Sequence, residues 1–470
     1  MDNFATRANA KTIPIVALTS KAYKAWFKSQ AKAIQTWLET TDFKAEAGNV
    51  ALLPDRDGAL SRVILGLGKP SRDPAKAAIW AAIWAYAALP GKLPKGRYEL
   101  EGELEPGAAD DAALGWALAT YRFDRYRTKP KSFPTLVWPK GANRKAVARV
   151  RNATFLARDL VNTPAGDLGP HELAEQAITV AEQYGGEATV IVGTDLVTAN
   201  YPAIYAVGKG SPEDRAPRLI DIRWGDEDAP KLSLVGKGVV FDTGGLDIKG
   251  ASGMKLMKKD MGGAATILAL AQMVMDANLP VRLRVLIPAV ENSISGDAFH
   301  PLDVLQTRRG ISVEVGNTDA EGRLILCDAL AEADDEQPDL LIDFATLTGA
   351  ARVALGTELP ALFANDDEVA AAILDAGIAT IDPLWRMPLF HSYRRHLDSR
   401  IADINNIASV GPGGAITAAL FLNEFVSRKT RWVHVDTMAY NLHARPGRPP
   451  GGEAMGLRAM FTMLERRYGK

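Results

Sequence analysis

The stretch "SLVGKGVVFDTGGLDIKGASGMKLMKKDMGGAAT", Ser233 to Thr266, shows the kind of unit from which this chain is built. It begins with an apolar strand that ends at Gly236, continues through a glycine-rich segment, and runs into the helix-like sequence "GGAATILALAQM". Apolar strands bounded by helices are typical of a mostly parallel sheet that is covered on both faces. The stretch therefore predicts an α/β fold.

The same alternation continues on both sides of this stretch. The strand candidates after about residue 165 are short and apolar: "ATVIVG", "RLIDIRW", "LSLVG", "VRLRVLIPAV", "LLIDFATL" and "RWVHVDTM". Helix candidates such as 262–278 and 413–429 lie between several of them. We therefore expect a large C-terminal α/β domain with a mostly parallel sheet flanked by helices.

The first 140 residues alternate shorter strands and helices and predict a small N-terminal α/β domain. "IPIVAL" and "RVILGLG" are the strand candidates, and "DPAKAAIWAAIWAYAAL" is a helix candidate. A passage rich in Pro and Lys, residues 126–141, predicts a boundary. Residues 142–163 predict one long helix. We expect domains at 1–140 and 165–470, joined by a linker helix at 141–164.

Bulk composition narrows the class of protein. The chain has 470 residues, 47% hydrophobic and 24% charged, as in ordinary soluble globular proteins. Its 55 Lys and Arg nearly balance 56 Asp and Glu, so no overall field recruits nucleic acid or acidic membranes. There is one cysteine, no signal-type N-terminus, and no apolar run long enough to span a bilayer. We expect a cytoplasmic protein with no membrane partner.

Acidic and basic side chains alternate in "NTDAEGRL", Asn317 to Leu324. If this segment were extended, Asp319, Glu321 and Arg323 would all point to one side. Two carboxylates suit a divalent cation, and a guanidinium suits an anion. A solvated turn with a surface ion pair explains the same pattern about as well.

The opening stretch carries Lys237, Asp242, Lys249 and Asp260 along its glycine-rich segment. Glycines there let the backbone approach a bound group. These residues fit a pocket at the carboxyl ends of strands, where open α/β sheets place their ligands. A third segment, "DFATLTGAARVALG" at 343–356, predicts a strand end and a turn lining a pocket, although a plain buried strand and turn fits it equally.

Several other chemistries lack their patterns. The six histidines form no zinc-finger or HExxH spacing, and there is no GxSxG nucleophile elbow. The phosphate-loop and dinucleotide fingerprints are also missing, so a nucleotide-binding enzyme has only fold analogy behind it. Asp-Thr-Gly occurs at 242–244, but an aspartic protease needs a second such site.

The segments "VGKGVVFDTGG", "DMGGAA", "NTDAEGRL" and "ATLTGA" together resemble the leucyl aminopeptidase (cytosol aminopeptidase) family of two-metal exopeptidases. "DINNIASVGPGGAITAALFLNEFV" and "RPGRPPGGEAMGLR" resemble its C-terminal region, so the resemblance covers about residues 150 to 470. The chain differs from the usual pattern at "AFHPLDV", "FDTGG" and "IKGASGM". These differences affect the shape of the loops and the preferred side chain of the substrate. They remove none of the implied metal ligands.

This resemblance implies an aminopeptidase that releases N-terminal residues from peptides with a water activated by two divalent cations, Mn²⁺ or Zn²⁺, with Mg²⁺ as a third option. The ligands it implies are Lys237, Asp242, Asp260, Asp319 and Glu321. Asp242 and Glu321 would bridge both ions. Lys237 and Asp260 would complete the tighter site, and Asp319 the more exchangeable one. Lysine binds metal only as a neutral amine, a form that neighbouring cations favour.

The resemblance also assigns residues to catalysis and substrate binding. Lys249 would stabilise the developing oxyanion, and Arg323 would hold a bicarbonate-type anion that moves the proton. Four residues fall where the family lines its substrate pocket: Met257, Asn317, Thr346 and Leu347. The family further implies peptide substrates and a homohexamer.

A binding protein is the competing hypothesis: a DNA-binding or inactive scaffold member of the same family. "YRFDRYRTKPK", residues 121–131, mixes basic and aromatic side chains as a nucleic-acid surface does. A solvated linker face is the favoured interpretation of that segment. The presence of all five ligands and both catalytic residues favours the enzyme.

Overall fold

The computed structural model describes residues 3–69, 81–104, 107–129 and 132–469, which form two compact units. Unit 1 consists of Met1–Phe155 and His443–Pro450, and unit 2 of Leu156–Leu442 and Gly451–Lys470. The long helix expected at 142–163 is α7 (Arg144–Asn162). The division of the chain into domains at residues 140 and 164 stays a prediction.

Unit 1 has a mixed sheet in the order β1-β6-β5-β2-β4-β3, in which only β3 runs antiparallel to its neighbour. Its strands are β1 (Phe4–Ala5), β2 (Ile13–Thr19), β3 (Val50–Pro54), β4 (Leu60–Gly68), β5 (Arg97–Leu100) and β6 (Thr135–Val137). Its helices are α1 (Ser20–Lys28), α2 (Lys32–Thr40), α4 (Ala82–Ala87), α5 (Leu89–Lys92) and α6 (Ala108–Ala119). The two predicted strands are confirmed as β2 and β4, and the helix predicted at 73–89 lies partly outside the described residues.

Unit 2 is built on a larger sheet in the order β16-β15-β18-β14-β9-β11-β8-β7, with β10 also paired to β11. Its strands are β7 (Glu187–Val192), β8 (Arg218–Trp224), β9 (Lys231–Gly236), β10 (Gly238–Asp242), β11 (Arg282–Asn292), β14 (Leu340–Ala345), β15 (Ala361–Ala364), β16 (Trp385–Arg386) and β18 (Trp432–Asp436). All six strand candidates of the C-terminal part belong to this sheet.

The centre of the sheet, β18-β14-β9-β11, is parallel, so the predicted fold class is confirmed. Towards the edges, β8 runs antiparallel to β11, β7 to β8, and β15 to β18. Large sheets of this class commonly carry antiparallel edge strands. The central strands share one direction, so their carboxyl ends meet at one edge.

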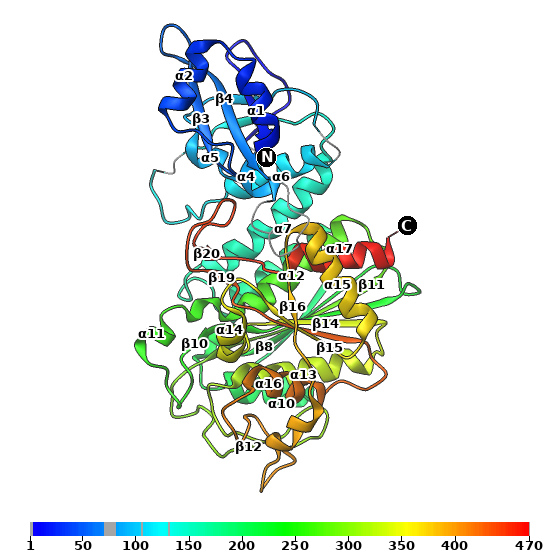
Figure 1. Ribbon diagram of the computed structural model, residues 1–470. Coiled ribbons are helices and arrows are strands. Elements are labelled where there is room, and N and C mark those ends of the chain that lie inside the picture. The colour runs from blue at the N-terminus through cyan, green and yellow to red at the C-terminus, as the bar shows by residue number, and fades with distance from the viewer. Residues whose placement is uncertain (1–2, 70–80, 105–106, 130–131, 470) are drawn as a thin grey trace. The chain divides into compact units, whose positions relative to one another are not determined.

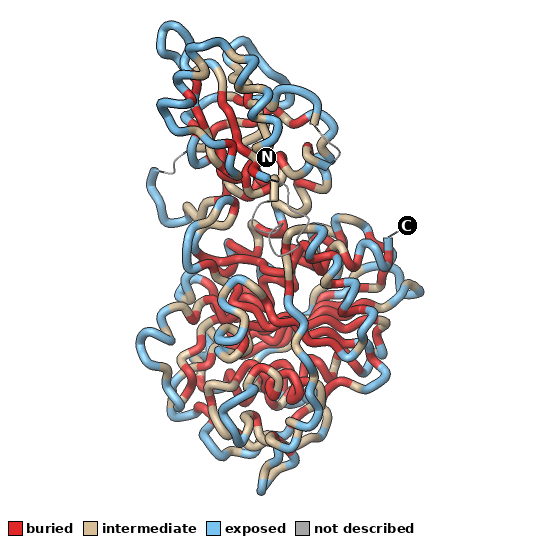
Figure 2. The backbone as a smooth tube through the Cα atoms, viewed as in Figure 1, coloured by how far each residue is buried: buried red, intermediate tan, exposed pale blue. Residues whose placement is uncertain are grey.

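Helices cover both faces of this sheet (Figure 1). Helices α12 (Gly262–Asp276), α15 (Asp367–Thr380) and α17 (Leu457–Tyr468) lie on one face, and α10 (Pro202–Gly208), α13 (Glu321–Asp335) and α16 (Gly414–Asn423) on the other. Figure 2 shows the strands and their covering helices as the buried layer of unit 2. Helix α12 is buried almost throughout and is apolar nearly all round, whereas α13 is also largely buried but carries charged residues among its buried positions, Glu321 and Arg323 included.

The remaining elements of unit 2 are short or lie at its margins. They are α8 (Pro170–Gln183), α9 (Asp195–Thr198), α11 (Ala251–Met254), α14 (Gly349–Leu355), the 3₁₀ helices η1 (Glu213–Arg215), η2 (Met257–Met261) and η3 (His391–Leu397), and the strands β12 (Val304–Leu305), β13 (Val313–Glu314), β17 (Ile404–Asn405), β19 (Tyr440–Asn441) and β20 (Gly451–Gly452). The helix predicted at 413–429 is shorter than expected, since α16 ends at Asn423.

Close packing of strand and helix brings the polar segments together. A Cβ atom on Gly236 would lie 2.6 Å from Ala264 Cα, so glycine lets the end of β9 touch the first turn of α12. This contact places Lys237, which follows β9, beside Asp260, which precedes α12.

Candidate metal centre

The candidate site lies at the carboxyl ends of the central strands. Lys237 follows β9, Asp242 ends β10, and Thr346 follows β14. Asp319 and Glu321 stand at the start of α13. Ligands of open α/β sheets bind at this edge, so the fold alone is enough to gather residues that lie far apart in the chain.

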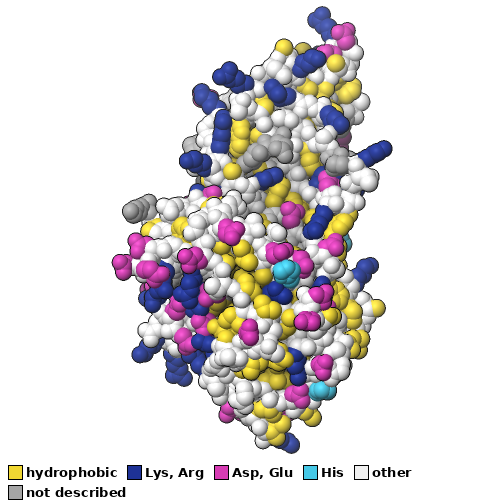
Figure 3. Space-filling model, turned by 180° about the vertical axis from the view of Figure 1, so that it is seen from behind, with side chains coloured by type: hydrophobic (Ala, Val, Ile, Leu, Met, Phe, Trp, Pro, Cys, Tyr) yellow, Lys and Arg dark blue, Asp and Glu magenta, His cyan; other side chains and the backbone are white. Residues whose placement is uncertain are grey.

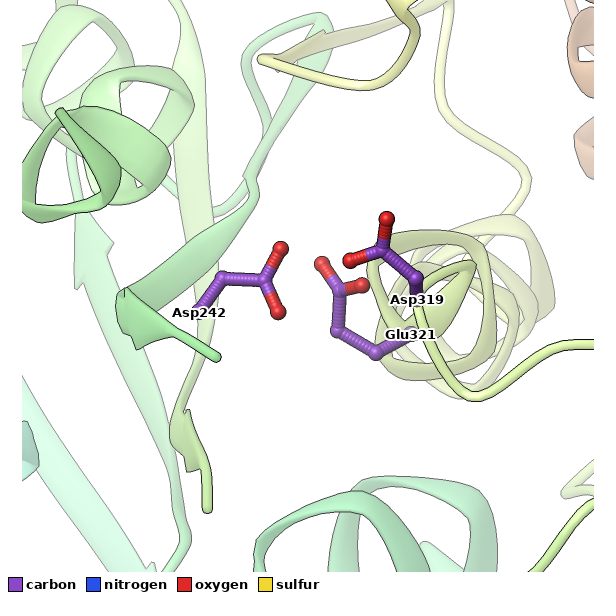
Figure 4. A group of neighbouring side chains, drawn as sticks. All are labelled: Asp242, Asp319 and Glu321. Carbon is purple, nitrogen blue, oxygen red and sulfur yellow. The ribbon is translucent and has the colours of Figure 1, made fainter. Parts of the chain in front are cut away.

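Three carboxylates converge at this edge, as Figure 4 shows. Asp242 points from the end of β10 towards Asp319 and Glu321, and one oxygen of each lies within 4.8 Å of the others. Carboxylates approach this closely when a cation lies between them, because like charges repel. This geometry suits a divalent ion with oxygen ligands.

The expected reason for the convergence was wrong. Glu321 is the first residue of α13, so the segment is a turn that enters a helix rather than an extended loop. On a helix, Arg323 is turned away from Glu321. Its guanidinium is buried and donates a hydrogen bond to the carbonyl oxygen of Asn406. Arg323 therefore lies outside the set of residues that line the carboxylate pocket.

Each of two lysines contacts two carboxylates. Lys237 Nζ lies 2.6 Å from Asp260 Oδ2 and 2.8 Å from Glu321 Oε1. Lys249 Nζ lies 2.9 Å from Asp242 Oδ2 and also contacts Asp319 Oδ1. The site thus has two neighbouring positions where positive charge is balanced by carboxylate pairs.

The pocket changes the proton affinity of its members. Burial lowers the pKa of Lys237, but Asp260, Glu321 and Asp242 outweigh it, and the pKa is raised. Burial and the charge of Asp242 raise the pKa of Glu321 to about 8. Burial also opposes ionisation of Asp260, yet the ammonium of Lys237 holds its pKa below the ordinary value. The carboxylates thus depend on positive charge to stay ionised.

Several buried oxygens of the site accept no hydrogen bond from the described residues. They are Asp260 Oδ2, Asp319 Oδ1, Glu321 Oε1 and Glu321 Oε2. Lysine ammonium groups lie at ion-pair distance from three of them, and Glu321 Oε2 is the fourth. Buried polar atoms normally have partners, so the position beside Glu321 Oε2 suits a cation. Oxygen ligands with one amine suit Mn²⁺, Zn²⁺ or Mg²⁺.

Polar neighbours hold two of the carboxylates: Thr346, which the sequence assigned to the substrate pocket, and Asn292, which sequence reasoning missed. Thr346 Oγ1 donates to Asp260 Oδ1 at 2.7 Å. Asn292 Nδ2 donates to Asp242 Oδ1 at 2.9 Å and to the carbonyl of Thr318 at 3.1 Å. Such contacts orient metal ligands. Asn292 ends β11, two residues beyond the strand predicted at 281–290, and its place next to that carboxyl end was the available signal.

Gly322 follows Glu321 because no side chain fits there. A Cβ atom on Gly322 would lie 2.7 Å from Lys237 Nζ and closer still to Cε. Glycine therefore lets the lysine pass over the first turn of α13 and reach Glu321. This packing explains why a glycine stands between Glu321 and Arg323.

The carboxylate pocket has a volume of about 200 Å³. Besides the metal-ligand candidates and Lys249, its walls include the predicted substrate residues Met257, Thr346 and Leu347. Asn317 lies outside the wall, where its Oδ1 accepts a hydrogen bond from the backbone N–H of Asp319 at 2.7 Å. The other wall residues are Lys259 and Thr437, with Thr348, Gly349 and Arg352 from the segment 343–356 that was predicted to line a pocket.

A second, larger cavity of about 1320 Å³ includes Arg309, Arg386, His391 and Arg394 in its lining but no predicted site residue. Two of its arginines form ion pairs, Arg394 with Glu424 of the same lining at 2.8 Å and Arg386 with Asp367. We therefore locate the chemistry in the smaller pocket, where the carboxylates lie.

Comparison with known families matches almost the whole chain. Residues 155–461 match the model described as "Cytosol aminopeptidase family, catalytic domain", and residues 13–139 match "M17 aminopeptidase, N-terminal domain". The second match extends the similarity beyond residues 150–470, where the sequence alone suggested it. Among the described residues, no helix is long and apolar enough to cross a membrane.

Individual proteins are similar over the same span. The chain is 37% identical over 456 residues to the probable cytosol aminopeptidase of Chlorobaculum tepidum, covering 90% of each chain. It is 47% identical to the crystal structure of the cytosol aminopeptidase of Coxiella burnetii, with a TM-score of 0.92 and 100% of both chains covered. The bottromycin maturation enzyme BotP, solved in complex with Mn, has a TM-score of 0.85 at 33% identity and covers 98% of this chain and 100% of its own.

Proposed function

The chain belongs to the cytosol aminopeptidase family and is a metal-dependent aminopeptidase that hydrolyses peptides, and we propose that the carboxylate pocket is its active site. Five residues would hold two divalent cations there: Lys237, Asp242, Asp260, Asp319 and Glu321. The observation that carries this proposal is the convergence of three carboxylates within 4.8 Å, with buried oxygens that accept no hydrogen bond from the described residues.

Position and burial suggest how the ligands divide. Asp242 and Glu321 face each other across the pocket and would bridge the two ions (Figure 4). Lys237 and Asp260 are almost fully buried and would complete the tighter site. Asp319 is the most exposed ligand and would belong to the ion that exchanges more readily. Mn²⁺ is the first choice because a related structure was solved with Mn.

When bound, a pair of such ions lowers the pKa of a shared water and can take the free α-amino group of a peptide. The protein's own groups then orient the reaction. Lys249 lies between Asp242 and Asp319, where its ammonium would stabilise negative charge on the oxygen of the first peptide carbonyl. An ammonium fixed before the reaction needs little reorganisation during it.

Arg323 would hold a bicarbonate-type anion that accepts and returns the proton. The residue is buried, and its Nε has no hydrogen-bond partner among the described residues. Burial lowers the pKa of Arg323 to about 10, so the guanidinium stays charged near neutral pH. An anion would supply the missing partner. Met257, Asn317, Thr346 and Leu347 would position the substrate, Asn317 through its hydrogen bond to Asp319.

The experiment that tests this function is an assay of amino acid p-nitroanilides and dipeptides on the full chain. Activity is measured after exhaustive chelation and again after Mn²⁺, Zn²⁺ or Mg²⁺ is restored. We expect loss of activity on chelation and recovery with at least one ion. Full activity after complete metal removal, verified by elemental analysis, would contradict the proposal.

The proposed oligomeric state and cellular location of the protein are taken from its family. Trp385, Phe390 and Val353 are exposed apolar side chains of unit 2 that an interface between copies would cover. We infer a homohexamer from the family resemblance alone, and a cytoplasmic location because the relatives are named cytosol aminopeptidases. Light scattering after size exclusion measures the assembly, and a monomer across the working concentration range would contradict it.

DNA binding is a second candidate role, favoured by one observation. Lys and Arg exceed Asp and Glu in residues 1–155, and Figure 3 shows basic side chains spread over the face of unit 1 that it presents. Retention on DNA that falls steeply with salt would support this role. Equal retention of the chain on DNA and on an uncharged matrix would exclude it.

A further inference from the structure

Two basic side chains line the carboxylate pocket without a part in the mechanism above, Lys259 and Arg352. Lys259 lies in η2 directly before Asp260, and its side chain is 4% exposed. Arg352 lies in α14, one turn after Gly349. They come from segments far apart in the chain, so their meeting in one small cavity is a property of the fold.

Neither group has a close carboxylate partner in the described part of the chain. The nearest carboxylate oxygen to Lys259 Nζ is Asp260 Oδ1, at 4.0 Å. Arg352 Nη1 lies 3.7 Å from Met438 Sδ, and its Nη2 lies 3.5 Å from the position of a Cβ on Gly349. The guanidinium thus folds back over Gly349 at the pocket wall. Both groups keep unused hydrogen-bond donors.

Other basic groups of unit 2 show the contrast. Arg284 Nη2 lies 2.7 Å from Asp221 Oδ2 and also contacts Glu332, and Lys231 Nζ donates to the carbonyl of Glu336 at 2.9 Å. These two groups have an oxygen partner within 3 Å, unlike Lys259 and Arg352 among the described residues. An ammonium and a guanidinium without a close carboxylate on the wall of one small pocket indicate that an anion belongs there.

Metal binding would increase the need for an anion near Lys259 and Arg352. If Asp260 is a metal ligand, as proposed above, its charge is shared with the cation and offsets Lys259 less. A substrate that places an apolar group in the pocket would leave both donors unpaired, whereas a carboxylate would satisfy them. The cavity of about 200 Å³ has room for a small side chain beside the ligands.

We propose that Lys259 and Arg352 bind a carboxylate of the peptide substrate, so that the enzyme prefers acidic peptides. This inference rests on the proposed function, because the ions would hold the α-amino group and so direct the first residue into this pocket. Two parts of a peptide can supply the group: the side chain of an N-terminal Asp or Glu, or the C-terminal carboxylate of a dipeptide.

The test compares isosteric substrate pairs with the Mn²⁺-loaded, full-length enzyme. Glu-Ala-Ala-amide against Gln-Ala-Ala-amide probes the side chain, and Leu-Ala against Leu-Ala-amide probes the C-terminus. We expect the carboxylate member of at least one pair to have a kcat/KM at least about tenfold higher, the scale of a charge-assisted hydrogen bond. The pair that shows the preference identifies the source, and equal values in both pairs would overturn the proposal.

Variants tie the preference to the two residues. Arg352→Met and Lys259→Met should each reduce the ratio within the responsive pair towards one, a readout that a general loss of activity does not move. Lys255→Met is the matched control: it removes an exposed lysine from the same segment and should keep the wild-type ratio. Arg352 is partly exposed, so its replacement does not threaten the fold.

The possible outcomes distinguish a failure of this inference from a failure of the proposed function. If no substrate is hydrolysed with any restored metal, the proposed function fails. If neutral peptides are hydrolysed well and neither pair shows a preference, only the role of Lys259 and Arg352 is wrong. A preference that persists in both Met variants would also refute their role.

Discussion

The two halves of the candidate metal centre differ in their access to solvent. The inner half is Lys237 with Asp260 and Glu321, whose side chains are 3%, 3% and 1% exposed. The outer half is Lys249 with Asp242 and Asp319, at 16%, 3% and 33%. If the pocket holds two ions as proposed, the inner half would keep its cation away from water, and the outer half would leave its cation open to substrate and exchange.

The largest effect should come from Asp242, the residue at the end of β10 that is proposed to contact the ions of both halves. Asp242→Ala removes a proposed bridge between both ions, and we expect kcat to fall by at least about a hundredfold, as when a key electrostatic group is lost. The melting temperature should change little, because the side chain serves the site rather than the core. Wild-type turnover in this variant would contradict the bridging role.

The two lysines offer the sharpest contrast between the halves. Lys237→Met should lower the metal content of the purified protein, since a ligand of the inner half is lost. Lys249→Met should keep the metal and lower kcat by about a hundredfold to a thousandfold, as expected for a group that stabilises the oxyanion. Elemental analysis and steady-state kinetics of both variants measure the difference. If both variants showed the same change in metal content and in kcat, the two lysines would not have different roles.

Metal binding to the inner half should strengthen as pH rises. Lys237 ligates only as a neutral amine, and its pKa is raised in the metal-free protein, while the pKa of Glu321 is about 8. Below these values each group holds a proton that the cation must displace. Each displaced proton changes the affinity by up to about tenfold per pH unit. Calorimetric titration with Mn²⁺ at pH 6, 7 and 8 measures this, and an affinity independent of pH would contradict it.

The smallest effect should come from a neighbour of the inner half. Thr346→Val removes the hydrogen bond to Asp260 Oδ1, which holds that carboxylate in place. We expect metal affinity to fall by about tenfold, at the low end for such supporting contacts. Thr348→Val, at the same pocket wall, is a comparison because Thr348 bonds Asp436 rather than a proposed ligand. If both variants lost metal affinity equally, the hydrogen bond from Thr346 to Asp260 would have no specific role in metal binding.

The acidic segment shows how far sequence reasoning reaches. Asp319 and Glu321 converge as expected, yet the alternation that suggested it was the wrong reason, because Glu321 begins a helix. Arg323 therefore turns away from the pocket, and Asn317 supports Asp319 from behind rather than lining it. Residue types close in sequence indicated the chemistry, but their directions depend on where α13 starts.

The N-terminal part gave the opposite lesson. Its motifs were too weak to indicate a family, and only comparison with known proteins related residues 13–139 to one. Its strands β2 and β4 were nevertheless predicted correctly, because their apolar runs are long and bounded by polar segments. Local patterns therefore indicate elements even where they reveal nothing about function.

By itself, the amino-acid sequence determined the alternation of strands and helices, the parallel centre of the large sheet and the residue types of the metal centre, because these depend on local apolar patterns and on short motifs. Tertiary structure alone decided which lysine meets which carboxylate, that Asn292 and Thr346 hold them, and that Lys259 and Arg352 share the pocket. Those relations join segments up to about a hundred residues apart. The packing of α12 and α13 against the sheet, with α14 at the pocket wall, brings them to one site.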